Sequence, residues 1–187
     1  MPVTDAMRAR HVVRQYLSTP LPDDVVAALR SRIEDNNRAH GTDIRLVTGD
    51  ARVFGPLWGT VRARSVRNCL IMSGPDAPDL DERLGYGGAD LMLAAQDLGL
   101  NTWWIGGTFS KRAAARVSGA TGRIVAVVAL GYGATQGSAH ASKRPEEVSS
   151  YEGQAPDWFT RGVEAALLAP TACQPRSEER RVGKECR

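Results

Sequence analysis

The chain lacks a long apolar run. Its longest aliphatic stretch, residues 124–130, is far shorter than the roughly 20 apolar residues that a membrane-spanning helix needs. The first residues, MPVTDAMRARHVV, also lack the apolar core of a secretory signal peptide. These absences predict a cytoplasmic protein without a membrane partner.

Cysteine and histidine are scarce. The 187 residues include three cysteines (Cys69, Cys173 and Cys186) and three histidines, with no CxxC or HExxH pattern among them. The sequence therefore predicts neither a disulfide framework nor a zinc-type ligand set. Reduced thiols and no metal site are the expectation.

Motifs of several catalytic classes are missing as well. Neither GxSxG nor GxxxxGK[ST] occurs, which argues against a serine hydrolase and a P-loop protein. Two glycine-rich stretches, GYGGAD (85–90) and GYGATQG (131–137), approach the dinucleotide fingerprint GxGxxG. In the first, Asp90 stands where the third glycine belongs, and in the second the last spacing is one residue too long. We interpret both stretches as ordinary turns.

The charge distribution gives little support for a nucleic-acid partner. The chain has 24 basic and 21 acidic residues, a net charge of +3. The last twelve residues, RSEERRVGKECR (176–187), hold five of the basic and three of the acidic ones. Without them, 24 − 5 = 19 basic residues face 21 − 3 = 18 acidic ones, a net charge of +1. No nucleic acid is expected as a ligand.

Apolar periodicity predicts a mixture of helices and strands. The helical pattern occurs at residues 22–41, 81–100, 110–119 and 156–171. Short apolar or β-branched runs predict strands at 43–49, 68–74, 101–107 and 123–131. Between them, residues 132–156 are predicted to form a long polar loop, and loops of such length are often functional.

The N-terminal stretch ARHVVRQY brings several basic side chains together. On a helix, Arg10 and Arg14 would lie one turn apart, so that their guanidinium groups share one face and can bind an anion. A solvated helix face is the alternative explanation.

The stretch WWIGGTF places a glycine pair directly after a predicted strand. Backbone N–H groups at Gly106 and Gly107 can approach a flat ligand closely, because glycine has no side chain. Trp103 and Trp104 before them are either part of this site or simply core residues.

Four stretches together resemble the flavin-dependent nitroreductase family. RHVVRQY before STPLPDDVV resembles its N-terminal signature, and GADLMLAAQDLGLNTWWIGGTF resembles its long helix and following strand. VAVVALGYGATQGSAHASKRPEEVS resembles a strand, a Gly-Tyr corner and a basic loop, and ALLAPTACQP resembles the stretch APSAxNxQPW. The last stretch stands late in the chain, an order similar to that of a permuted nitroreductase-like subfamily.

The resemblance implies an α+β sandwich with a mixed central sheet flanked by helices. It covers most of residues 7–175, so we expect one nitroreductase-like domain over residues 1–175 that is incomplete at its C-terminal end. The implied cofactor is FMN, with NAD(P)H as co-substrate and a nitroaromatic, quinone or similar small molecule as acceptor. Because the cofactor carries the chemistry, no catalytic side chain is predicted. A homodimer fits the resemblance.

The same resemblance assigns the N-terminal signature to the cofactor. Arg10 matches the arginine that contacts the FMN phosphate, and His11 stands where the family often has arginine. Arg14 matches the basic residue near the flavin pyrimidine. Val12 replaces the usual serine and removes a hydroxyl that could bond the cofactor.

Other cofactor residues are implied farther along the chain. Gly106 and Gly107 match the backbone that approaches flavin N5. Lys143 and Arg144 match basic loop residues that could reach the phosphate, and Thr171 matches the Ser/Thr of APSA.

Two alternatives remain open at this point. The first is a flavin-binding module with little or no turnover, suggested by Val12 and by the reduced motif after Thr171, where only Gln174 is kept. The second is a Rossmann-type NAD protein, which tight NAD binding without flavin would support.

The last twelve residues follow no structural pattern. The opening codons of a widely used sequencing adapter translate to RSEERRVGKECR in order, so we hypothesise that residues 176–187 are a non-native tail. A genuine charged, disordered tail is the alternative. The nucleotides beyond codon 175 distinguish the two.

Overall fold

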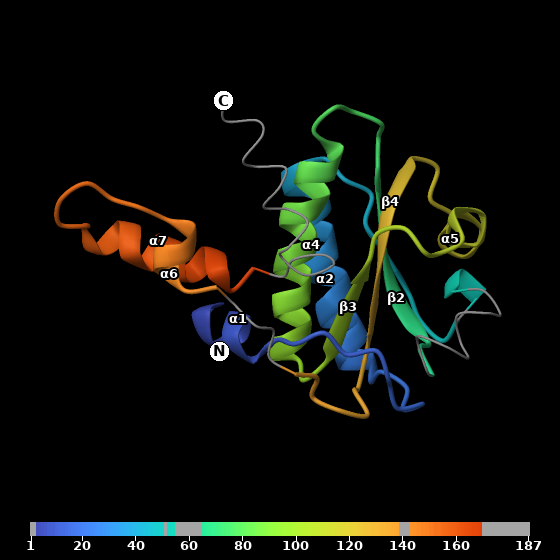
Figure 1. Cartoon of the computed structure of the whole chain (residues 1–187). Coiled ribbons are helices and arrows are strands. Elements are labelled where there is room, and N and C mark those ends of the chain that lie inside the picture. The colour runs from blue at the N-terminus through green and yellow to red at the C-terminus, as the bar shows by residue number, and fades with distance from the viewer. Residues whose placement is uncertain (1–2, 51, 55–64, 139–142, 170–187) are drawn as a thin grey trace. The chain divides into compact units, whose positions relative to one another are not determined.

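A computed structural model describes residues 3–50, 52–54, 65–138 and 143–169 of the chain (Figure 1). Its contacts divide the chain into two units, Met1–Ala139 and His140–Arg187. The first unit contains the helices α1 (Val3–Ala9), α2 (Asp23–His40), α4 (Leu80–Asp97) and α5 (Lys111–Ser118) and the 3-10 turn η1 (Arg52–Phe54). Its strands are β1 (Arg45–Val47), β2 (Asn68–Gly74), β3 (Asn101–Ile105) and β4 (Arg123–Gly131). The second unit contains α6 (Pro145–Val148) and α7 (Asp157–Leu167).

The four strands form one sheet in the order β1-β2-β4-β3, and each neighbouring pair is antiparallel. β2 and β4 lie in the middle, and β2 is buried at every position because both faces of the sheet are covered. One isolated parallel bridge joins Val12 to Thr102 of β3, so both kinds of pairing occur.

Helices cover both faces of this sheet. α2 and α4 pack on one face, and α5 and η1 lie on the other (Figure 1). The side chains of β2 alternate between the two layers: Leu70 and Met72 join the α2/α4 core, and Cys69 and Ile71 join the other. This arrangement confirms the expected α+β sandwich.

The stretch GYGGAD lies inside α4, so its interpretation as a turn is wrong. Gly88 is buried against the indole ring of Trp104, and an added Cβ would overlap that ring and lie 2.9 Å from Met72 Cε. A glycine is thus needed for close helix–strand packing, although it weakens the helix itself.

In the second unit, α6 lies within residues 132–156, which the sequence predicted to be a loop. Pro145 occupies the first turn, and Glu147 Oε2 accepts a hydrogen bond from the Arg144 backbone N–H at 2.7 Å. Both features favour a short helix at that point. Among the described helices, none combines the length and apolar character needed to cross a membrane.

Candidate functional site

The basic N-terminal signature is extended. α1 ends at Ala9, and the Val13 N–H donates to Thr102 O at 3.3 Å. Four residues on, the Leu17 N–H donates to Tyr132 O at 2.8 Å. The prediction of a shared helical face for Arg10 and Arg14 is therefore wrong, because pairing with β3 and with the chain after β4 overrides helical spacing.

Arg10 is the most unusual residue of this segment. Its side chain is 8% exposed, and within the described part of the chain no hydrogen bond or ion pair reaches its guanidinium group. Burial lowers the pKa of Arg10 below its ordinary value, because the charged form is poorly solvated. An unpaired buried charge is costly, so the position favours an anionic ligand.

Arg14 lies exposed four residues later. Its Cζ atom lies 5.3 Å from the centre of the Trp103 ring, within the range of a cation–π contact. The indole ring of β3 therefore holds this positive charge beside the strand. Trp103 and Trp104 are both half-buried, and each packs against a different core layer.

His11 and Val12 lie between the two arginines, with Val12 40% exposed. The chain after β4 packs directly on them: a Cβ at Gly137 would lie 2.7 Å from Val12 O and 2.9 Å from His11 Cβ. Gly137 also has a φ of +73°, which favours glycine. The glycine of GYGATQG thus brings two segments together.

Two polar residues at the start of β3 were missed by sequence reasoning. Asn101 is buried, and its Oδ1 accepts a hydrogen bond from the Gly133 N–H at 3.0 Å, which holds the chain after β4. Thr102 is 1% exposed, and its hydroxyl has no hydrogen-bond partner in the part of the chain that the structure describes. The available signal was a polar pair at the head of an otherwise apolar strand.

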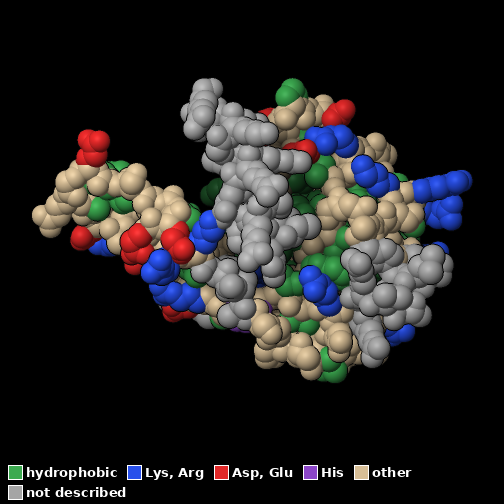
Figure 2. Space-filling model, in the orientation of Figure 1, with side chains coloured by type: hydrophobic (Ala, Val, Ile, Leu, Met, Phe, Trp, Pro, Cys, Tyr) green, Lys and Arg blue, Asp and Glu red, His purple; other side chains and the backbone are tan. Residues whose placement is uncertain are grey.

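Gly106 and Gly107 follow the other end of β3. Both are exposed, and a Cβ added at either would meet no atom within 4 Å. Four residues of extended strand, about 13 Å, separate Thr102 from Gly106. The structure thus places the N-terminal signature and the glycine pair along one strand. Figure 2 shows Lys and Arg side chains on the side of this unit where α5 follows the glycines.

The remaining predicted residues are elsewhere in the chain. Lys143 and Arg144 belong to the second unit, where the exposed Arg144 pairs with Glu147 at 3.5 Å. Thr171 lies outside the described residues.

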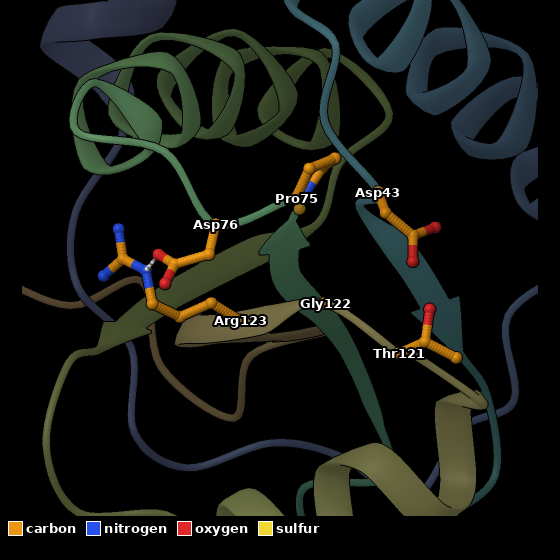
Figure 3. A pocket seen from close by; sticks show the side chains of 7 residues that line it. Asp43, Pro75, Asp76, Thr121, Gly122 and Arg123 are labelled. Carbon is orange, nitrogen blue, oxygen red and sulfur yellow. Dashed lines mark ion pairs between the residues drawn. The ribbon is translucent and has the colours of Figure 1, made fainter.

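A separate hollow of about 790 Å³ lies where β2 ends and β4 begins (Figure 3). Its lining includes Asp43, Asp76 and Arg123. Arg123 pairs with Asp76 at 2.8 Å and with Asp81 at 2.7 Å, so its charge is already balanced. The hollow lies at the opposite end of β4 from the N-terminal signature, a strand length of about 26 Å away.

A comparison with known families identifies the chain. It belongs to the nitroreductase family described as "Putative TM nitroreductase", which matches residues 2–176. The chain is therefore a nitroreductase-family oxidoreductase. No curated protein matches the chain.

Solved structures show the same fold. One, a "putative nitroreductase in complex with fmn" from Desulfovibrio desulfuricans, has a TM-score of 0.64 at 19% identity and covers 82% of this chain and 99% of that one. The NfrA1 nitroreductase of B. subtilis has a TM-score of 0.61 at 10% identity, with 86% and 78% covered. A "putative nitroreductase" from Thermotoga maritima has a TM-score of 0.57 at 17% identity, with 92% and 67% covered.

Proposed function

We propose that this protein is an FMN-dependent oxidoreductase that uses NAD(P)H to reduce nitroaromatic, quinone or similar small acceptors. Membership of the nitroreductase family supports the reaction class. The similar structure from Desulfovibrio desulfuricans, described as a complex with FMN, supports the cofactor.

The observation that carries the proposal is the buried position of Arg10, whose guanidinium has no hydrogen bond or ion pair among the described residues. A phosphate there would accept charge-assisted hydrogen bonds and compensate the lost hydration of the arginine. The backbone of Thr102 forms a β-bridge with Val12 of this segment, and the Thr102 hydroxyl, without a partner among the described residues, is a further donor close by. These residues fit a phosphate-bearing cofactor such as FMN.

The other residues have roles that follow from their exposure. Gly106 and Gly107 leave open space in which a planar ring can approach the backbone. Arg14, held over Trp103, provides positive charge beside the same strand. Bound FMN would supply the two-electron transfer, so the protein's task is to bind, orient and provide charge. In the second unit, Lys143, Arg144 and Thr171 are proposed as further cofactor contacts on the resemblance alone.

A flavin-binding module with little turnover is the second candidate. Val12 favours it. This exposed valine lies between the proposed cofactor residues Arg10 and Arg14, and it has no hydroxyl that could bond the flavin. Turnover separates the two candidates.

The test is a flavin titration followed by a turnover assay. FMN should bind saturably and more tightly than riboflavin, which lacks the phosphate that Arg10 would hold. The loaded protein should then oxidise NAD(P)H faster than free FMN does when a nitroaromatic or quinone is present. Binding without faster oxidation would favour the module, and no preference for FMN would overturn the proposal.

Three further expectations accompany this function. We propose a cytoplasmic protein, a homodimer in sedimentation experiments, and a domain of residues 1–175 followed by a non-native tail of residues 176–187. Removing the tail should leave flavin affinity unchanged.

A further inference from the structure

The two stretches of chain that form the proposed site contain no acidic residue. Between Asp97 and Glu146 the sequence contains no Asp or Glu, and the same is true between Asp5 and Asp23. These two stretches supply the N-terminal signature, β3, α5 and the chain after β4. A ligand bound along β3 would therefore meet basic side chains from these stretches and no acidic side chain from them.

Three of these cations lie on α5. Lys111, Arg112 and Arg116 are exposed, and within the described residues none of the three side chains makes an ion pair. This differs from Arg123, the basic residue that follows, which pairs with two aspartates. The α5 charges are thus available to a ligand.

Two of these charges are unfavourably placed for the helix itself, whereas Arg116 stands in the last turn, where the helix dipole favours a cation. Lys111 and Arg112 stand in the first turn, where the helix dipole favours acidic groups. Arg112 and Arg116 are four residues apart, a spacing at which like charges repel. By contrast, the longer helices α2 and α4 each begin with two acidic residues. A bound anion would relieve both kinds of repulsion on α5.

α5 is fixed directly after the glycine pair. The Ser110 side chain accepts a hydrogen bond from the Ala113 N–H at 3.2 Å, and the Ser110 N–H donates to Val53 O at 3.1 Å. Only Thr108 and Phe109 separate Gly107 from this cap. The helix is about 12 Å long, so its cations lie within reach of an extended dinucleotide whose reacting ring is at the glycines.

We propose that Lys111, Arg112 and Arg116 bind the 2′-phosphate of the reducing co-substrate, so that NADPH is the preferred donor over NADH. This inference rests on the proposed function, because it assumes a nicotinamide donor at Gly106 and Gly107. The FMN phosphate is assigned to Arg10, which leaves the α5 cations for a second anion. NADPH differs from NADH by the one phosphate group that such a cluster would recognise.

The first experiment compares kcat/KM for NADPH and NADH in the FMN-loaded full chain. Exposed charge contacts are individually weak, so three together predict a preference for NADPH of about tenfold. The triple variant Lys111→Gln, Arg112→Gln and Arg116→Gln should bring the ratio near one. Arg30→Gln is the matched control, because Arg30 is an exposed cation on α2, which packs on the opposite face of the sheet. The control should keep the wild-type ratio.

A second measurement does not depend on turnover. Calorimetric titration of the chain with 2′,5′-ADP and with 5′-AMP should show tighter binding of 2′,5′-ADP, and the difference should disappear in the triple variant. It should also shrink when the ionic strength is raised from 0.05 to 0.5 M, because salt screens exposed charges.

The outcomes separate this inference from the proposed function. A chain that binds no FMN but still distinguishes 2′,5′-ADP from 5′-AMP through α5 contradicts the proposed function and supports the phosphate-binding role of the α5 cations. Equal use of NADH and NADPH by an active, FMN-loaded chain overturns the inference and leaves the function. Equal losses for both donors in the triple variant also overturn it, because the cations would then act on the shared part of the donor.

Discussion

The buried charge of Arg10 makes a prediction in which stability and function change in opposite directions. The perturbation is Arg10→Met, which keeps a long apolar stem and removes the guanidinium group. In the flavin-free protein, Arg10 is 8% exposed and its guanidinium has no partner among the described residues. The substitution should therefore stabilise the flavin-free chain while it weakens FMN binding.

The expected magnitudes follow from the burial. Replacing a buried ion pair with apolar residues of similar volume is often neutral or stabilising by about 1–4 kcal/mol, and a lone buried charge lacks even the compensation that a partner gives. Because Arg10 is charged but not fully enclosed, an increase of about 1–2 kcal/mol in the free energy of unfolding is expected. A hydrogen bond to a charged group contributes about 1.5–3 kcal/mol, so the preference for FMN over riboflavin should fall about 10- to 100-fold.

Denaturant unfolding of the flavin-free chain and titrations with both flavins provide the two measurements. Arg8→Met is the matched control, because Arg8 is 61% exposed and only 4.0 Å from Asp5, a weak surface pair. It should change neither quantity. Arg10→Lys keeps the charge without the two-pronged donor geometry and should retain part of the preference for FMN.

The reasoning fails if Arg10→Met destabilises the flavin-free chain and leaves the preference for FMN intact. Arg10 would then serve the fold. Stabilisation with an unchanged preference would place the phosphate elsewhere.

Three further predictions concern the fold around the site. Gly88→Ala should be less stable than Gly85→Ala by about 1–3 kcal/mol in denaturant unfolding, because both gain helix propensity but only Gly88 faces an indole ring; equal stabilities would refute the close packing. Hydrogen bonds from Arg32 lower the pKa of Asp90 below 3.8, so this stabilisation is complete above pH 3.8 and is lost as the pH falls through the lowered pKa. Asp90→Asn should accordingly cost about 1 kcal/mol at pH 7 and progressively less in acid, and a pH-independent cost would argue against the ion pair. Burial raises the pKa of the Cys69 thiol to about 12, so iodoacetamide at pH 8 should label Cys69 only after unfolding, as peptide mapping by mass spectrometry would show.

The central sheet could be predicted from the sequence because its strands are short, apolar and bounded by turn residues. Residues 68–74 and 123–131 form strands with the predicted limits. α5 lies within the helix predicted over residues 110–119, and Ser110, a residue type that favours helix starts, caps it by accepting the Ala113 N–H. These elements obey local rules, and the tertiary structure agrees with them.

The failures occur where distant segments decide the local structure. Arg10 and Arg14 have helical spacing, but the backbone around Val13 pairs with β3. GYGGAD has turn-like composition, but its glycines let α4 lie close to Trp104. In both cases the deciding partner is remote in sequence, so periodicity and composition do not contain it.

The two ends of the sheet differ in how their charged side chains are compensated. Around the hollow at the start of β4, the acidic and basic side chains pair with one another, as in the contacts of Arg123. At the opposite end of the sheet, Arg10 is 8% exposed and its guanidinium has no hydrogen bond or ion pair among the described residues, and the buried Thr102 hydroxyl has no partner among them either. Folded proteins rarely leave such groups unbonded, since each costs free energy that packing must offset. The cost is explained if these donors are satisfied by a bound anion, and that makes the start of β3, rather than the hollow at the start of β4, the place to look for the cofactor phosphate.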